Sequence, residues 1–311
     1  MSSVEVAQSA GTAAATVAET GGTGQGRGIV RGNIRLLGSE LRLVFRRRRN
    51  QLLLLVVALF PLLIGIGLKV AAPQSGGGNG PSGGSGNGAG AFFNQLAGNG
   101  VFLTFIALTL LLILVLPMVI AVISGDSVAG EAGYGTLRYL LAVPAGRTRL
   151  LVVKFVTIAA FAVCATFIVA VIALLVGVIL FPVGPVTLLS GSTVSLGSGL
   201  LHVFYVTLYV SCAMVAVGAI GLAISTFTEH AIGAIAAIML LIVASEVVDQ
   251  VPQFAAAGPY LPTHWWTSFD ALLRSPIDTT TMWHGLLSFL VYTLIFVAIA
   301  WARFTSSDVT S

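Results

Sequence analysis

The chain has 311 residues, of which 57% are apolar and only 8% are charged, and its mean hydropathy is +1.00. Soluble proteins carry roughly a quarter charged residues because their surfaces face water, so this composition predicts an integral membrane protein. The net charge of +4 does not indicate nucleic-acid binding, because eight of the 15 basic residues precede residue 50 and adjoin the first apolar run. That arrangement is typical of membrane topology signals.

The N-terminal region divides into a polar tail and an amphipathic segment. Residues 1–30 are rich in Ala, Gly, Ser and Thr and lack an apolar period, which predicts a disordered cytoplasmic tail. In residues 31–50, apolar side chains recur at helical spacing beside arginines. This pattern favours a helix that lies flat in the headgroup layer with its arginines at the lipid phosphates. A non-helical basic anchor is the alternative.

Six apolar runs are long enough to cross a bilayer, since about 20 helical residues span its hydrocarbon layer. They predict an all-α transmembrane domain over residues 51–303, with spans at about 51–71, 101–123, 153–181, 201–225, 231–250 and 284–303. Thirteen basic residues fall on one side of these spans and two on the other. This bias predicts a multi-pass protein of the plasma membrane with both termini, including residues 304–311, in the cytoplasm.

Two outer connections differ in character. Residues 75–90 contain nine glycines and predict a flexible linker. In residues 252–283, the side chains of Trp266, Phe269 and Leu273 share one helical face, which predicts short outer helices before the sixth span. An ordinary aromatic loop at the membrane interface remains open.

The spans lack the groups that drive other classes of membrane protein. No Asp, Glu, Lys, Arg or His lies near the middle of a predicted span, whereas ion-coupled transporters and pumps keep such groups there. Neither lysine follows a glycine, so the chain has no GxxxxGK[ST] phosphate loop. We therefore expect that no cofactor or metal is bound by this chain, and that energy for any transport comes from a partner.

The connection between the second and third spans carries the most distinctive motif, SGDSVAGEAGYGTLRYLLAVPAGRTRLLVVK, at residues 124–154. Gly133 and Gly135 break the preceding helix, Thr136 can cap a short amphipathic helix, and Pro144 ends it. Lys154 is then expected at the lipid boundary of the third span. The short helix is suited to sit in a partner's groove, and a membrane-surface helix without a partner is the alternative.

This motif resembles the signature of type-2 ABC exporter permeases, the membrane subunits of drug, antibiotic and polysaccharide exporters. The shared pattern is E-x-x-x-G-T-L-x-x-L-L-x-x-P-x-x-R-x-x-L-L-x-x-K, from Glu131 to Lys154. The amphipathic helix, the six spans and the short helices before the sixth span are also similar. The resemblance implies a coupling helix that contacts a separate ATPase, with the coupling residues Glu131, Gly135, Thr136, Leu137, Arg138, Leu140, Leu141 and Arg147.

The resemblance also implies partners. The permease would dimerise with a second permease copy, identical or not, and bind two copies of an ABC ATPase subunit that holds ATP and Mg. Membrane lipids surround such a protein, and no nucleic acid is expected.

Two acidic residues, Glu246 and Asp249, lie on one helical face near the outer end of the fifth span. With Trp266 and Phe269 they are candidates for lining an outer pathway. The alternative is that the two acids only mark the end of the span.

The favoured function is that of a permease in an ATP-driven exporter of an apolar or amphiphilic substrate, such as a drug, an antibiotic or a lipid-linked compound. The uncharged middle of the spans supports this class of cargo. The competing hypothesis is a lipid-modifying membrane enzyme that uses His264, Asp270 or Asp278 as acid or base at its outer face.

Overall fold

The computed structural model describes residues 36–71, 99–133, 146–184, 186–187, 193–273 and 279–306. The chain divides into two units, Met1–Phe45 and Arg46–Ser311. In the first unit the described residues, 36–45, are helical. The predicted tail 1–30, the Gly-rich connection 75–90 and the predicted coupling helix within 134–145 lie outside the described residues.

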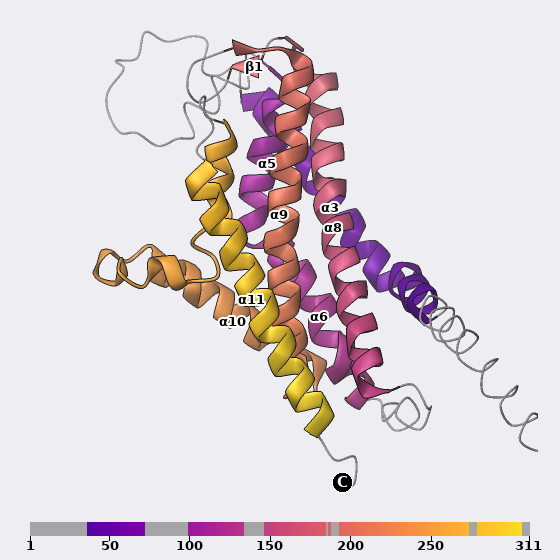
Figure 1. Ribbon diagram of the computed structural model, residues 1–311. Helices are drawn as coiled ribbons and strands as arrows, with labels where there is room; N and C mark the ends of the chain where they lie inside the picture. Colours follow the sequence, from indigo (N-terminus) through magenta and orange to yellow (C-terminus); the bar gives the residue numbers. More distant parts are fainter. Residues whose placement is uncertain are drawn as a thin grey trace, which may run out of the picture. The chain divides into compact units, whose positions relative to one another are not determined.

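The second unit consists of long helices that run back and forth along one another (Figure 1). They are α3 Arg48–Ala71, α5 Phe102–Ile113, α6 Val115–Gly133, α8 Arg147–Leu180, α9 Leu196–Ser225, α10 Ala231–Asp249 and α11 Thr279–Ser306. The shorter elements are the paired strands β1 Val186–Thr187 and β2 Thr193–Val194, and the 3-10 helices η2 Pro252–Phe254, η3 Gly258–Tyr260 and η4 Trp266–Leu273.

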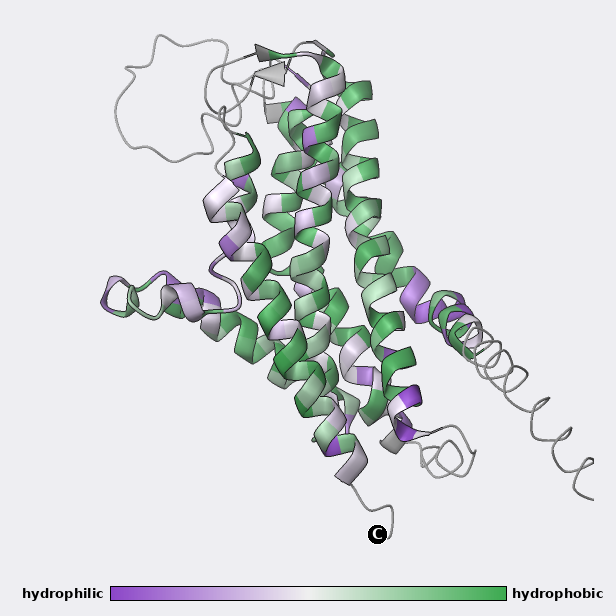
Figure 2. Cartoon of the chain, in the orientation of Figure 1, coloured by the Kyte–Doolittle hydropathy of each residue, from purple (hydrophilic) through white to green (hydrophobic). Residues whose placement is uncertain are grey.

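Hydropathy and length fit these helices to a bilayer. Among the described residues, five helices are long and apolar enough to cross it, and α5 with α6 brings the total to six when the two are counted as one broken span. Apolar residues cover most of α8, α9 and α11 (Figure 2). The predicted all-α, polytopic membrane fold is confirmed.

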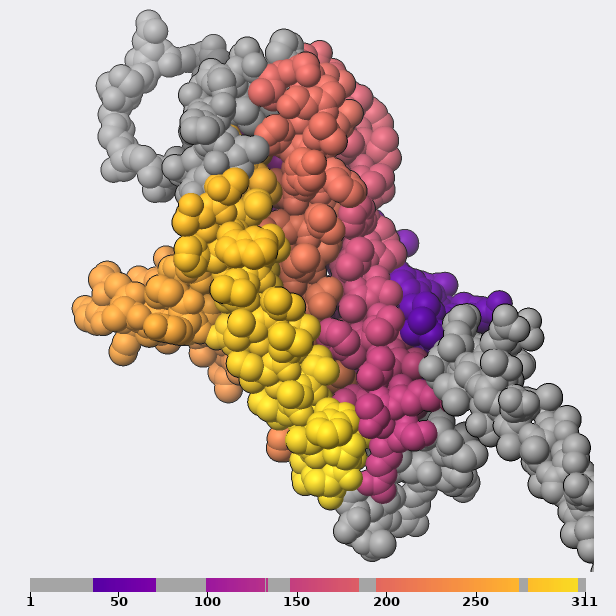
Figure 3. Space-filling view, in the orientation of Figure 1, coloured from indigo at the N-terminus to yellow at the C-terminus, as the bar shows by residue number. Residues whose placement is uncertain are grey.

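Helix α9 is the central element of this bundle. It packs against α6, α8 and α11, and 72% of its most apolar 18-residue window is buried, against 17% for α11. Figure 3 shows α9 between α11 and α8 in the upper half of the view, whereas α11 and α8 adjoin in the lower half. Gly221 permits close packing, because a Cβ there would overlap the Ser124 hydroxyl of α6.

The second span is broken near its middle. Helices α5 and α6 meet at 52° around Leu114. Pro117, the third residue of α6, has no N–H to donate to the Ile113 carbonyl one turn earlier, and its ring crowds that carbonyl. Pro61 lies inside the 24-residue helix α3 without a comparable break, so the two prolines within spans act differently.

Two glycines bring the residues just before α5 against the last turn of α8. A Cβ at Gly100 would overlap the backbone of Gly177, and the reverse holds for a Cβ at Gly177. The Gly100 N–H also donates to the Pro182 carbonyl at 2.9 Å. We call this end of the bundle the top, and the opposite end, where α6, α9 and α11 end and α8 and α10 begin, the base.

Candidate functional site

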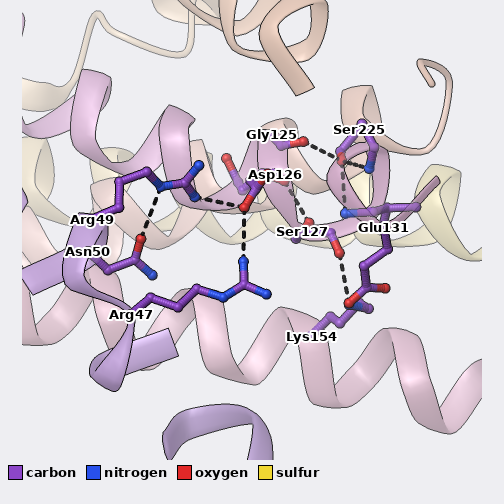
Figure 4. Close-up of polar contacts among 12 residues, drawn as sticks. Arg47, Arg49, Asn50, Gly125, Asp126, Ser127, Glu131, Lys154 and Ser225 are labelled. Atoms are coloured by element: carbon purple, nitrogen blue, oxygen red, sulfur yellow. Dashed lines mark hydrogen bonds and ion pairs between the residues drawn. The ribbon is translucent and has the colours of Figure 1, made fainter. Parts of the chain in front are cut away.

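Near the base, α6 and α8 extend beyond the apolar runs of their spans, and charged side chains there pair with one another. Lys154, the eighth residue of α8, places its Nζ 2.6 Å from Oε1 of Glu131, which lies in the last turn of α6. The same ammonium donates to the Ser127 carbonyl at 2.8 Å. These contacts tie together the two helices that flank residues 134–145 (Figure 4).

The Lys154 side chain is only 4% exposed. The sequence predicts this side chain at the lipid boundary. It is instead buried against α6. A buried ammonium is tolerated only when an opposite charge and further hydrogen-bond acceptors surround it. Glu131 and Ser127 supply both, so the ion pair holds α6 and α8 in one specific register.

A second charged contact joins the start of α3 to α6. Oδ2 of Asp126 accepts hydrogen bonds from Nη1 of Arg47 at 3.2 Å and from Nη2 of Arg49 at 2.7 Å (Figure 4). A Cβ at Gly130 would overlap Oδ1 of Asp126, so a glycine one turn later leaves room for the carboxylate along the helix. Asp126 thus orients Arg49, in the first turn of α3, and Arg47, the residue directly before that helix.

A hydroxyl group connects α9 to α6. Ser225, the last residue of α9, donates from Oγ to the Gly125 carbonyl at 2.8 Å. The same Oγ accepts from the N–H groups of Val128 at 3.1 Å and Ala129 at 2.9 Å. In an α-helix the Ala129 N–H donates to the Gly125 carbonyl four residues earlier. The Ser225 hydroxyl of α9 therefore bonds to both members of one hydrogen-bonding pair of α6.

The first turn of α8 is also bonded to the last turns of α11. Nη1 of Arg147 donates to the Thr305 carbonyl at 3.1 Å. Nε1 of Trp301 donates to Oγ1 of Thr148 at 3.0 Å. Through these contacts the helix that follows residues 134–145 is joined to the C-terminal end of the described chain.

The structure describes only some of the residues that the motif singles out. Of the predicted coupling residues it places Glu131 against α8 and Arg147 against α11, and the remaining six lie outside the described residues. Asp126 and Ser225 had no role in the sequence-based prediction, and Arg47 and Arg49 belonged to a segment whose arginines were expected only at the lipid phosphates. The only signals in the sequence for Asp126 and Ser225 were an acid close to the end of the second span and a serine that ends an apolar run.

The four candidate outer residues are two acidic residues at the end of α10 and two buried aromatic residues of η4. Oδ1 of Asp249 lies 2.6 Å from Nδ1 of His264, and Glu246 forms no ion pair with another described residue. Trp266 and Phe269 are 3% and 1% exposed. They fill the contact of η4 with the bundle, and they do not present an open surface in this structure.

The described residues contain no group of three or more His, Cys, Asp or Glu side chains that could hold a metal ion. The polar contacts described near the base connect helices to one another. These contacts lie on the helices that flank the connection between α6 and α8.

The fold is that of a polytopic helical membrane protein, and polar contacts join its helices near the base. The family model described as ABC-2 family transporter protein matches residues 40–309. This match covers most of the chain, so the chain belongs to the ABC-2 transporter family, as its motif predicted. No curated protein matches the chain. Family membership identifies an ABC transporter permease, a membrane subunit distinct from the ATPase, and implies an ABC ATPase as its partner.

Proposed function

We propose that this permease dimerises and couples ATP hydrolysis by two copies of a cytoplasmic ABC ATPase to the export of an apolar or amphiphilic compound across the plasma membrane. Residues Thr136–Leu141 would form the coupling helix that contacts the ATPase. The observation that carries the proposal is the ion pair between Glu131 and Lys154, because it ties the two ends of the connection 134–145 together.

The contacts near the base support a transmission role for this connection. A force on residues 134–145 acts on α6 and α8 at the point where Lys154 joins them. From α6 the force would pass to α9 through Ser225, and from α8 it would pass to α11 through Arg147. Discrete polar contacts between packed helices can exchange as units, which is how small displacements become changes between two arrangements.

The proposed membrane orientation and substrate class are argued from where charged residues lie in the chain. The described basic residues near the base include Arg147, Arg149, Lys154 and Arg303, and a basic excess favours the cytoplasmic side. The middles of the spans carry no Asp, Glu, Lys, Arg or His, which suits an apolar or amphiphilic substrate and leaves ATP hydrolysis by the partner as the source of energy.

The coupling helix is tested in the complex of this chain with its ATPase. We expect Leu137→Asp and Leu140→Asp to abolish co-purification of the ATPase and transport in reconstituted vesicles, because a charge would enter an apolar contact. Val183→Asp, at an exposed position three residues after the end of α8 at the top of the bundle, is the matched control and should retain both. Wild-type assembly and turnover in the two coupling variants would contradict the proposal.

The ion pair is tested separately from assembly. Glu131→Gln should leave the ATPase bound but lower the amount of substrate exported per ATP hydrolysed, because the connection is no longer tied at both ends. The exchanged pair Glu131→Lys with Lys154→Glu should recover part of that ratio. A lipid-modifying enzyme would instead act on its substrate with no ATPase present, and that result would overturn the assignment.

A further inference from the structure

Four consecutive arginines, Arg46–Arg49, lie directly before the apolar part of α3. All four side chains are exposed. Arg47 falls between the helical residue 46 and the start of α3 at Arg48. The cluster therefore stands where the chain enters the membrane domain.

A single carboxylate neutralises part of this cluster. Asp126 accepts from Arg47 and Arg49 through one oxygen, and these two side chains remain 49% and 50% exposed. Four positive charges and one negative charge leave a net +3. Each guanidinium has five N–H donors, so the pairing with Asp126 uses only a small share of them. Among the described residues, Arg46 and Arg48 form no ion pair.

We propose that Arg46–Arg49 bind the phosphate groups of anionic phospholipids, and that a lipid phosphate competes with Asp126 for Arg47 and Arg49. The side chains that follow select a lipid over a free phosphate. Leu52, Leu55 and Leu59 are 62%, 61% and 44% exposed and continue along α3 from the arginines. Acyl chains can cover these leucines while the phosphate meets the guanidinium groups.

The site reaches α6 through Asp126. The carboxylate lies along α6 because Gly130 leaves it space, and it is 12% exposed. When a lipid phosphate takes Arg47 and Arg49, the connection between the start of α3 and α6 is released. An effect of this release on transport rests on the proposed function, whereas lipid binding itself does not.

Native mass spectrometry of the purified full chain, titrated with phosphatidylglycerol or phosphatidylcholine, tests the site without ATP or ATPase. We expect tighter binding of phosphatidylglycerol, and a loss of affinity of about five-fold for each arginine removed in Arg46→Gln and Arg48→Gln. Asp126→Asn should tighten binding, because the competing carboxylate is lost. Lys69→Gln, at the other end of α3, is the matched control and should change nothing.

Each outcome decides a part of the proposal. Equal affinity for the two lipids, or wild-type affinity in the Arg46→Gln/Arg48→Gln variant, would overturn the site. Unchanged affinity in Asp126→Asn would overturn the competition. If inorganic phosphate displaces the bound phosphatidylglycerol at equal concentration, the leucines have no role and the lipid assignment fails. Since no readout needs transport, failure here is distinct from failure of the exporter assignment.

Discussion

The base of the bundle and the segment between α10 and α11 hold their helices together by different means. Near the base, α6 is joined to α8, α3 and α9 by an ammonium, two guanidinium groups and a hydroxyl. In the segment from Pro252 to Leu273, aromatic side chains dominate. Tyr209 donates to the Trp265 carbonyl at 2.7 Å, and Trp265 stacks on His284 with ring centroids 5.8 Å apart.

The difference bears on how each region can move. An ion pair or a hydroxyl bridge has few alternative geometries, so it is either formed or lost, and a helix held by several such contacts can switch between positions. Aromatic packing spreads its stabilisation over many weak atom contacts, and close-packed surfaces resist small shifts. We infer that the base is the part that rearranges and that the aromatic segment is the frame against which it does so.

The largest effect is expected from Lys154→Met. Removing one partner of a buried ion pair leaves the other charge uncompensated, which costs about 3 kcal/mol. Denaturant unfolding of the purified protein in detergent measures this loss. The double variant Glu131→Gln/Lys154→Met should regain part of the stability, because no lone carboxylate remains. A single variant as stable as the wild type would show that the pair does not anchor the base.

The sequence predicts the parts of this structure that depend on local signals. Apolar runs of span length identify the helices, because each run must cross the same hydrocarbon thickness. The motif from Glu131 to Lys154 identifies the family, since its residue types and spacing are contiguous in the chain. Gly133, expected to break the second span's helix, is the last described residue of α6, and the residues after it lie outside the described part of the chain.

The contacts between helices were not predictable in this way. Lys154 and Glu131 are 23 residues apart, and Ser225 is 100 residues from Gly125, so their meeting depends on how the helices are rotated about their axes. Hydropathy reports which residues avoid water but not which face of a helix meets which neighbour. The break at Leu114 was equally hidden, because Pro61 in α3 has no such consequence.

The next effect concerns the aromatic frame. A Cβ at Gly285 of α11 would overlap the Tyr209 hydroxyl of α9, so Gly285→Ala should cost about 2 kcal/mol through overpacking. In the background Tyr209→Phe the nearest colliding atom is absent, and the added cost should be smaller. A double-mutant cycle of unfolding free energies measures the coupling. Strict additivity would show that the two helices do not meet there as tightly as the structure indicates.

A smaller effect is expected at the hydroxyl bridge. Ser225→Ala removes three hydrogen bonds between α9 and α6, but Ala129 can then donate to Gly125 within α6, so the loss should be about 1 kcal/mol. Thr226→Ala is the matched control, because that hydroxyl bonds only to Ala223 of its own helix. In the transport assay, Ser225→Ala should lower export per ATP and Thr226→Ala should not. Equal transport in both variants would remove Ser225 from the transmission route.

The smallest effect should come from the ion pair that joins the aromatic segment to the end of α10. His264 and Asp249 are 33% and 20% exposed, and partly exposed pairs contribute about 0.5 kcal/mol. Asp249→Asn should therefore alter stability little and leave export per ATP unchanged, because the frame is held by the buried Trp266 and Phe269 beside it. Unfolding and transport measured on the same preparation test both statements. If Asp249→Asn uncoupled transport as strongly as Glu131→Gln, the outer pair would be a moving part too, and the division of the bundle into a switching base and a fixed frame would fail.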